Sequence, residues 1–369
     1  MSETAVNGVE PIIFLDDVHV TFRTRTGSIL HPNLVHAVQG VTIRLMPGQT
    51  IGIVGESGCG KSTTANVMCG LQAPTSGKVY FKGKDVTKRT AEDRRHMGRV
   101  ISVVFQNPAT ALNPRMVVRE QLLDPMRVHN LGTEAEQEKR VKELLELTGL
   151  PSSAAEVLPG QLSGGQRQRV AIARALSLNP DAIIADEPTS ALDVSVRAQI
   201  LNLLTDLKKE LGLAMVFISH DIQTVRYISD DIIVMNGGKI VEQGKVVDIF
   251  MSPQHETTKA LIGNVMARDM PASILDRFRK ARENHPNSDA VYLLRLAFSG
   301  NEVTRPVISE CSRRFNLDFN ILRGTVDDVQ GQTLGSLTVL IEAESSVFIE
   351  AVNFLRENGV VVEEINDVK

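Results

Sequence analysis

Short apolar runs recur along the chain, and each is followed at once by glycine or polar residues. They are Thr50–Val54, Val100–Phe105, Ala182–Ala185 and Ala214–Ile218. Runs of this length that are apolar on both faces are typical of strands buried in a parallel sheet. Segments with helical periodicity lie between them. The pattern predicts an α/β fold whose strands end at one edge of the sheet, where ligands bind.

The residues after the first run have the spacing of a phosphate-binding loop: a glycine, four residues, then Gly-Lys-Ser. Glycines let backbone N–H groups point at phosphate oxygens, and the helix expected from Lys61 adds its positive end. Lys61 then reaches the β- and γ-phosphates, and Ser62 offers a hydroxyl to Mg²⁺. The expected nucleotide-binding residues of this loop are Gly55, Glu56, Ser57, Gly58, Cys59, Gly60, Lys61, Ser62 and Thr63.

The other runs carry chemical groups to the same edge. Asp186 and Glu187 follow the third run, His220 follows the fourth, and Gln106 follows the second. Asp186 is suited to orient the Mg²⁺ shell, and Glu187 to polarise the attacking water as general base. His220 is placed to contact the γ-phosphate. These positions predict a nucleotide-hydrolysing site.

A second anion site is predicted at Leu162–Gln166 (LSGGQ), which precedes the helical run QRQRVAIARAL. Ser163, Gly164 and Gly165 open this helix, so their N–H groups and the hydroxyl are available to an anion.

With these motifs in this order, the chain from about Ile12 to about Leu261 resembles the ATP-binding cassette family, the nucleotide-hydrolysing subunits of ABC transporters. The resemblance implies a mixed sheet with a helical subdomain, and ATP and Mg²⁺ as ligands. It makes Gln106 a further metal ligand beside Ser62 and Asp186. It also adds Gln166 and Asp193 to the nucleotide-binding residues, because the signature at Ser163–Gln166 completes the ATP site of a second cassette.

The adenine ring needs an aromatic partner in this family. Phe22, in the early strand VHVTF, is the residue we expect to stack on it, with His19 and Tyr80 as alternatives.

Other segments resemble the cassettes of oligopeptide and dipeptide importers. They are Val103–Met116, the expected long loop Arg23–Asn33 and the run DEPTSALDVSVRAQILNLL. An importer cassette implies two integral-membrane permease subunits, an extracytoplasmic substrate-binding protein and a peripheral location on the cytoplasmic face of the cell membrane. The helix expected at Glu134–Leu150 belongs to the helical subdomain, with i,i+4 ion pairs of Glu136 with Arg140 and of Glu138 with Lys142.

The C-terminal third has a different composition. Residues 251–288 are rich in Pro, His, Asn and basic residues, and Asp276–Glu283 reads as a solvated helix in a linker. Strand and helix patterns then follow as β-α-β-β-α-β between Val291 and Ile365, a ferredoxin-like α+β plan. The expected domains are a cassette at 10–262, a linker at 263–289 and a regulatory domain at 290–369.

This last domain resembles the NIL domain through Asn320-Ile321-Leu322, Gln330-Gly331 and Leu355–Gly359. The NIL domain follows the cassette of methionine importers and binds cytosolic methionine, which inhibits uptake. The resemblance favours a methionine importer with Asn320 near the regulatory ligand. The alternative is a peptide or nickel importer whose C-terminal domain only dimerises. Both favour a homodimer.

Composition excludes other classes. A formal charge of −4 over 369 residues with no long basic run argues against a nucleic-acid partner. The chain has a single set of cassette motifs, which argues against the tandem-cassette ATPases that act on DNA or ribosomes. No stretch of about 18 apolar residues predicts a spanning helix. The N-terminus MSETAVNGVE lacks the features of a signal peptide. Three cysteines without metal spacing indicate reduced thiols.

Overall fold

The computed structural model describes residues 5, 8–28, 31–263, 272–285, 290–299, 305–329 and 332–365. The chain divides into two compact units, Met1–Gly244 and Lys245–Lys369. The division falls before residue 262, where the sequence predicts the end of the cassette.

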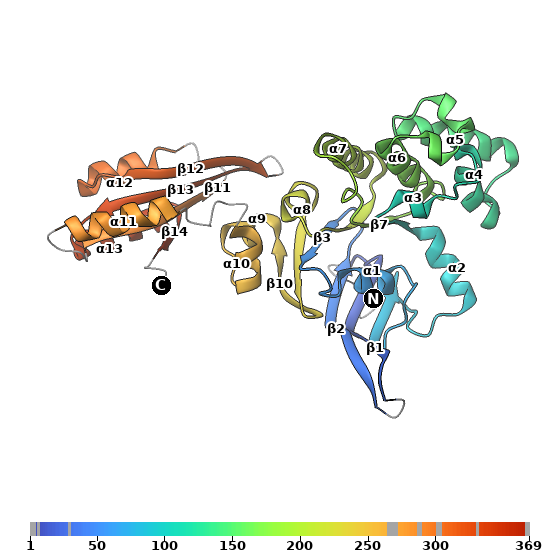
Figure 1. Ribbon diagram of the computed structural model, residues 1–369, viewed down its shortest axis with the longest axis horizontal. Helices are drawn as coiled ribbons and strands as arrows, with labels where there is room; N and C mark the ends of the chain where they lie inside the picture. The colour runs from blue at the N-terminus through green and yellow to red at the C-terminus, as the bar shows by residue number, and fades with distance from the viewer. Residues whose placement is uncertain are drawn as a thin grey trace. The chain divides into compact units, whose positions relative to one another are not determined.

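A six-stranded sheet forms the centre of the larger unit (Figure 1), in the order β10-β9-β3-β8-β7-β6. Pairing is parallel from β9 through β3, β8 and β7 to β6. The apolar runs predicted as buried strands are four of these strands, which confirms the α/β prediction. The bounds are β3 Thr50–Gly55, β6 Ile101–Val104, β7 Ala182–Asp186, β8 Ala214–Ile218, β9 Asp231–Asn236 and β10 Lys239–Lys245.

Helices follow the strands that carry the predicted site. α1 (Lys61–Met68) follows β3, α7 (Val194–Leu211) follows β7, and α8 (Ile222–Ile228) follows β8. α8 approaches β3 closely at Gly52, because a Cβ there would lie 2.0 Å from Val225 Cγ1 and 2.5 Å from Ser229 Oγ. Only a glycine lets this helix pack directly on the strand.

An antiparallel sheet of order β2-β1-β4-β5 shares one hydrophobic core with the central sheet. Its strands are β1 Ile13–Ser28, β2 His31–Leu45, β4 Ser76–Phe81 and β5 Lys84–Asp85, and α2 (Ala91–Val100) follows. The expected loop at Arg23–Asn33 is wrong, because β1 continues to Ser28 and β2 begins at His31. Alternating Thr and Arg residues in this segment are compatible with a strand.

Four helices that pack on one another form the helical subdomain. They are α3 Pro108–Ala111, α4 Val118–Val128, α5 Glu134–Leu147 and α6 Gly164–Ala175. The two ion pairs expected within α5 are wrong. Glu136 accepts the Thr133 N–H and hydroxyl at the start of the helix, and Glu138 pairs with Arg119 of α4. Capping and helix-to-helix contact therefore replace the pairs along the helix.

The smaller unit contains the predicted β-α-β-β-α-β plan. Its sheet is antiparallel, in the order β12-β13-β11-β14. The elements are β11 Val291–Ser299, α12 Val307–Phe315, β12 Asn320–Val329, β13 Gln332–Glu342, α13 Ser345–Glu357 and β14 Val361–Glu364. Three helices in the described ranges of this unit precede them, α9 (Val246–Met251), α10 (Glu256–Gly263) and α11 (Ala272–Asn284).

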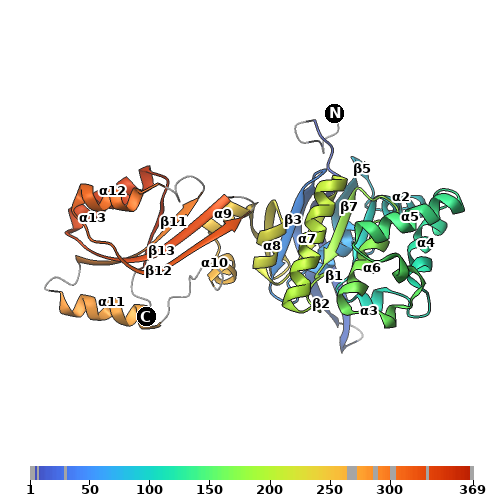
Figure 2. The same ribbon diagram turned by 90° about the horizontal axis from the view of Figure 1, so that it is seen from above.

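The predicted linker contains α11 (Ala272–Asn284), which is not a fully solvated helix. Ile274 and Phe278 are 7% and 4% exposed and pack against Val291, Leu293 and Leu340 of the sheet. The charged residues at 276–283 suggested a solvated helix. The buried face consists of only two apolar residues, Ile274 and Phe278, and Ile274 lies before the charged run. Figure 2 shows α12 and α13 on one face of the sheet and α11 on the other.

We predict that Gly52→Ala lowers the stability of the larger unit by about 1–3 kcal/mol, the usual cost of overpacking. The midpoint of urea-induced unfolding measures it. Adding Val225→Ala should cost less than the sum of the two single changes, because it removes the nearest clash. Gly160→Ala is the control, since a Cβ there meets nothing within 4 Å. A Gly52→Ala protein that unfolds at the wild-type urea concentration would contradict the packing.

Candidate nucleotide-binding site

The predicted phosphate-binding loop joins β3 to α1 and depends on glycine at three points. Gly55, Gly58 and Gly60 have φ values of 151°, 78° and 105°, in the region that favours glycine. A Cβ at Gly55 would lie 2.2 Å from Met235 O, and one at Gly60 would lie 2.3 Å from Ala37 O. The loop is therefore held against the backbone of β9 and of β2.

Lys61 lies inside the loop. Its side chain is 6% exposed, and Nζ donates to the carbonyls of Gly55 and Glu56, each at 2.8 Å. Cys59 Sγ is 3.8 Å away. Both oxygens are neutral, so an anionic phosphate oxygen is a stronger partner for the ammonium group. The loop thus holds a cation where a phosphate is expected.

Ser62 and Asp186 come together from α1 and β7, with Ser62 Oγ donating to Asp186 Oδ1 at 3.3 Å. Burial raises the pKa of Asp186, and the negative charge of Glu187 raises it further. A hydroxyl and a carboxylate are hard oxygen donors that suit Mg²⁺, which usually keeps waters and phosphate oxygens as its other ligands. The described residues contain no cluster of three His, Cys, Asp or Glu side chains that fits a metal. Ser62 and Asp186 provide two hard oxygen donors, which suits a Mg²⁺ ion that takes its remaining ligands from water and a nucleotide.

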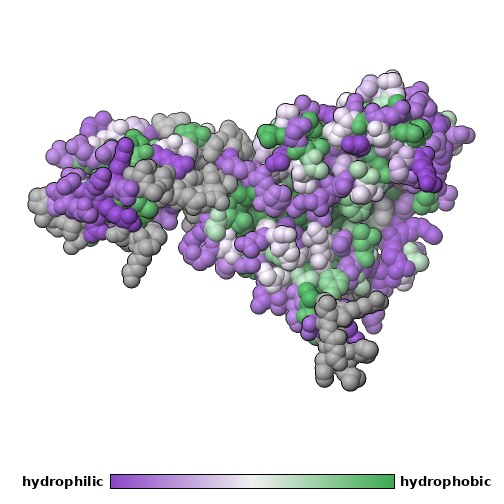
Figure 3. All heavy atoms as spheres, viewed as in Figure 1, coloured by the Kyte–Doolittle hydropathy of each residue, from purple (hydrophilic) through white to green (hydrophobic). Residues whose placement is uncertain are grey.

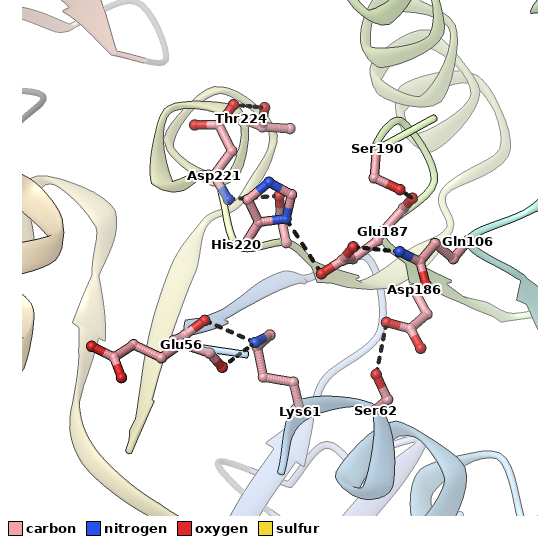
Figure 4. A network of polar contacts seen from close by, with 12 residues as sticks. Glu56, Lys61, Ser62, Gln106, Asp186, Glu187, Ser190, His220, Asp221 and Thr224 are labelled. Carbon is pink, nitrogen blue, oxygen red and sulfur yellow. Dashed lines mark hydrogen bonds and ion pairs between the residues drawn. The ribbon is translucent and has the colours of Figure 1, made fainter. Parts of the chain in front are cut away.

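Glu187 has polar side chains on two sides (Figure 4). Gln106 Nε2 donates to its Oε2 at 2.8 Å, and His220 Nδ1 lies 3.4 Å from its Oε1. Ser190 Oγ donates to the Glu187 carbonyl at 3.0 Å. The three residues predicted as catalytic thus lie together. The Gln106 amide, predicted as a metal ligand, is bonded to Glu187.

The signature residues form a second group, with the segment before α7. Ser163 caps α6, because its Oγ accepts the Gln166 N–H at 3.2 Å while Gln166 Oε1 accepts the Ser163 N–H at 2.9 Å. Asp193 caps α7 by accepting the Val196 N–H at 2.9 Å, and this bond lowers the pKa of Asp193.

The two helix starts touch. A Cβ on Gly165 would lie 2.6 Å from Val196 Cγ1, and one on Gly164 would lie 3.7 Å from Leu192 Cδ2. The predicted signature and Asp193 are therefore neighbours in the same chain.

The three candidates for adenine stacking differ in their surroundings. Tyr80 stacks on Phe14 with ring centroids 5.5 Å apart, and His19 Nε2 lies 3.3 Å from Asp17 Oδ1. Phe22 of β1 is exposed and pairs across the sheet with Val35 of β2. Asn320, the residue expected near a regulatory ligand, is exposed on the edge strand β12 of the smaller unit.

A glycine turn supports the phosphate-binding loop, and this contact is not predictable from the sequence patterns. Gly238 donates its N–H to Cys59 O at 3.0 Å. Gln39 bonds the same turn twice, through its N–H to Gly238 O and through Nε2 to Gly237 O, both at 2.8 Å. The Asn236-Gly237-Gly238 sequence marks the turn, but no local signal marks its contact with a loop far away along the chain.

Comparisons with known proteins identify the family of the chain. The profile of the ABC transporter family matches residues 38–190, and that of the NIL domain matches residues 292–364. A methionine import ATP-binding protein of Ralstonia nicotianae is 42% identical over 339 residues, which cover 90% of this chain and 95% of the relative. One from Burkholderia ambifaria is 41% identical over 335 residues, covering 91% and 95%. The chain belongs to the ABC transporter family.

Solved cassettes of the family have the same fold. A dimeric cassette in a post-hydrolysis state bound to ADP and Pi aligns with a TM-score of 0.57 at 33% identity, covering 63% of this chain and 98% of that chain. A subunit of a Clostridium perfringens ABC transporter complex aligns with a TM-score of 0.58 at 27% identity, covering 72% and 99%. The larger unit is thus an ABC ATPase cassette, and the smaller unit carries a NIL domain, as the sequence predicts.

Three further observations concern this ABC protein. No helix in the described ranges has both the length and the apolar content needed to span a membrane. On the face drawn in Figure 3, polar residues cover most of the surface, with apolar residues dispersed among them. A cavity of about 650 Å³ is lined by residues such as Pro47, Asp181 and Leu213, which precede β3, β7 and β8. It lies at the sheet edge opposite the predicted site residues.

We predict that Gly165→Ala lowers ATP hydrolysis roughly tenfold, because the added methyl displaces the signature turn from α7 at a cost of about 1.4 kcal/mol. Steady-state phosphate release measures it. Val196→Ala should restore part of the rate in the double variant. A double variant as slow as Gly165→Ala would show that the contact with Val196 is not the cause.

Proposed function

We propose that this chain is the ATP-hydrolysing subunit of a methionine importer. The observation that carries the proposal is the group of Glu187, Gln106 and His220 beside Lys61, Ser62 and Asp186 at one sheet edge. The substrate class is supported by the methionine import relatives, which match along nearly their whole length.

Each group has a role in ATP hydrolysis. The loop N–H groups and Lys61 bind the β- and γ-phosphates, and Phe22 stacks on the adenine. Ser62 and Asp186 hold Mg²⁺, which neutralises charge on the phosphate oxygens. Glu187 accepts the proton of the attacking water. Gln106 and His220, which bond to this carboxylate, orient it toward the water.

A second copy of the chain completes each site. Ser163, Gly164 and Gly165 present a helix N-terminus, which attracts anions. Ser163 bonds to Gln166 of its own helix, and Gly164 and Gly165 face Leu192 and Val196 at the start of α7. In a head-to-tail pair, the signature of one copy covers the ATP held by Lys61 of the other. ATP then joins the copies, and hydrolysis releases them.

The remaining partners follow from the importer function. Two permease subunits hold the homodimer at the cytoplasmic face of the membrane, and an extracytoplasmic protein delivers the substrate. Cytosolic methionine binds the NIL domain near Asn320 and slows hydrolysis. This regulation needs only about 1–3 kcal/mol of coupling between the two sites.

We expect Glu187→Gln to keep ATP binding and to slow hydrolysis by roughly 10²–10⁴-fold, the usual contribution of a general base. Equilibrium binding and phosphate release on the same preparation separate the two effects. Glu146→Gln, an exposed glutamate of α5, is the matched control and should turn over like wild type. Full turnover by Glu187→Gln would refute the assigned base.

We also expect methionine, but not leucine, to inhibit ATP hydrolysis by the full-length chain in its permease complex. Asn320→Ala should raise the methionine concentration for half inhibition by about 2–10-fold, the value of one hydrogen bond. Asp318→Ala, exposed just before the same strand, is the control. A wild type that methionine does not inhibit would remove the regulatory role of the NIL domain, and unchanged inhibition in Asn320→Ala would remove the role of Asn320 alone. Either result leaves the ATPase intact.

A further inference from the structure

The first turn of α7 touches both groups of predicted site residues. Val196 packs against Gly165 of the signature, where a Cβ would lie 2.6 Å from Val196 Cγ1. Arg197, the next residue, donates from Nη1 to Asp221 Oδ2 at 3.5 Å. Asp221 directly follows His220. Adjacent residues of one helix thus contact the signature and the segment that carries His220.

The Asp221 carboxylate is fixed to that segment. Its Oδ1 accepts the Gln223 N–H at 3.0 Å, and its Oδ2 accepts the Thr224 hydroxyl at 2.8 Å. The backbone N–H of Asp221 donates to Ser219 Oγ at 3.0 Å. Hydrogen bonds thus connect Asp221 to the residues on both sides of His220, and Figure 4 shows its bond to Thr224.

The start of α7 is also connected to Glu187. α7 begins at its cap Asp193, and Ser190, three residues earlier, donates to the Glu187 carbonyl at 3.0 Å. His220 contacts the Glu187 carboxylate at 3.4 Å. Glu187 is thus linked to α7 by two routes, through its carbonyl and Ser190 and through His220 and Asp221.

The ion pair between Arg197 and Asp221 is incomplete. Arg197 uses one nitrogen at 3.5 Å, and its Nε is buried with no hydrogen-bond partner. Arginine and carboxylate groups often pair through two hydrogen bonds of about 2.7–2.9 Å. The two side chains are 33% and 30% exposed, so they are partly shielded from solvent. The pair therefore has an unused donor and a distance longer than that of a strong ion pair.

We propose that Arg197 is a positioning residue that relays occupation of the signature to His220 and Glu187 of the same chain. The inference rests on the proposed function, in which the signature covers the ATP of a second copy. When that ATP binds, α7 shifts with Gly165, the Arg197–Asp221 pair tightens, and His220 moves Glu187 toward its working position. Hydrolysis at each site then depends on nucleotide at the other.

The test is ATP hydrolysis by the purified full-length chain over a range of ATP concentrations. We expect a Hill coefficient between 1 and about 2, the number of coupled sites. Arg197→Met should lower it toward 1 and reduce kcat by roughly 2- to 30-fold, the range that mutations along a coupling path produce. Affinity for ATP in the absence of turnover should stay unchanged, because Arg197 does not touch the nucleotide loop.

Asp221→Asn keeps an oxygen for the cap of α8 and removes the charge, so it provides a second variant should Arg197→Met fold poorly. The double variant should be no slower than either single one, since both break the same pair. Arg197→Lys should retain part of the cooperativity. Lys209→Met, exposed on the same helix, is the control. A purely structural role would lower the melting temperature without changing the Hill coefficient.

Three results overturn the relay and leave the ATPase intact. They are a non-cooperative wild type with normal turnover, an Arg197→Met protein as cooperative as wild type, and losses that add in the double variant. A wild type that does not hydrolyse ATP overturns the proposed function, and the relay with it.

Discussion

Parallel pairing of the central strands is the constraint on which the rest of the larger unit depends. The register places Val104 beside Ala185, Asp186 beside Ile218 and Ile218 beside Ile53. Residues that follow these positions therefore emerge at one level, although they are far apart in the sequence. Neighbouring strands lie about 4.8 Å apart, so side chains from adjacent strand ends can meet directly. The hydrogen bond from Gln106 to Glu187 and the contact of His220 with Glu187 follow from this register.

Most of this arrangement is predictable from the sequence because it depends on local patterns. Apolar runs locate the strands, glycine spacing locates the phosphate-binding loop, and motif order supplies the family. The partners of individual side chains are less accessible. Glu138 was expected to pair with Lys142 within α5, but it pairs with Arg119 of α4. Such pairings depend on how helices and strands pack, which the spacing of charges along one helix does not reveal.

The smaller unit shows the same limit. Its strand and helix order was predictable, whereas the packing of α11 on the sheet was obscured by the charges around Phe278. Composition describes the average character of a segment, but two apolar residues four apart are enough to fix a helix on a sheet. The Gln39 bonds to the glycine turn are a comparable case, because they join residues whose proximity only the folded chain creates.

Glu187 has a φ of 46°, in the left-handed region that few residues other than glycine adopt readily. Holding a glutamate there costs on the order of 1–2 kcal/mol. A glycine at position 187 would therefore make the folded state more stable, whereas the proposed chemistry requires a carboxylate there. A search for heat-resistant variants that ignored activity would select against the residue that we propose as the general base. Stabilising this protein without loss of turnover must therefore begin elsewhere in the chain.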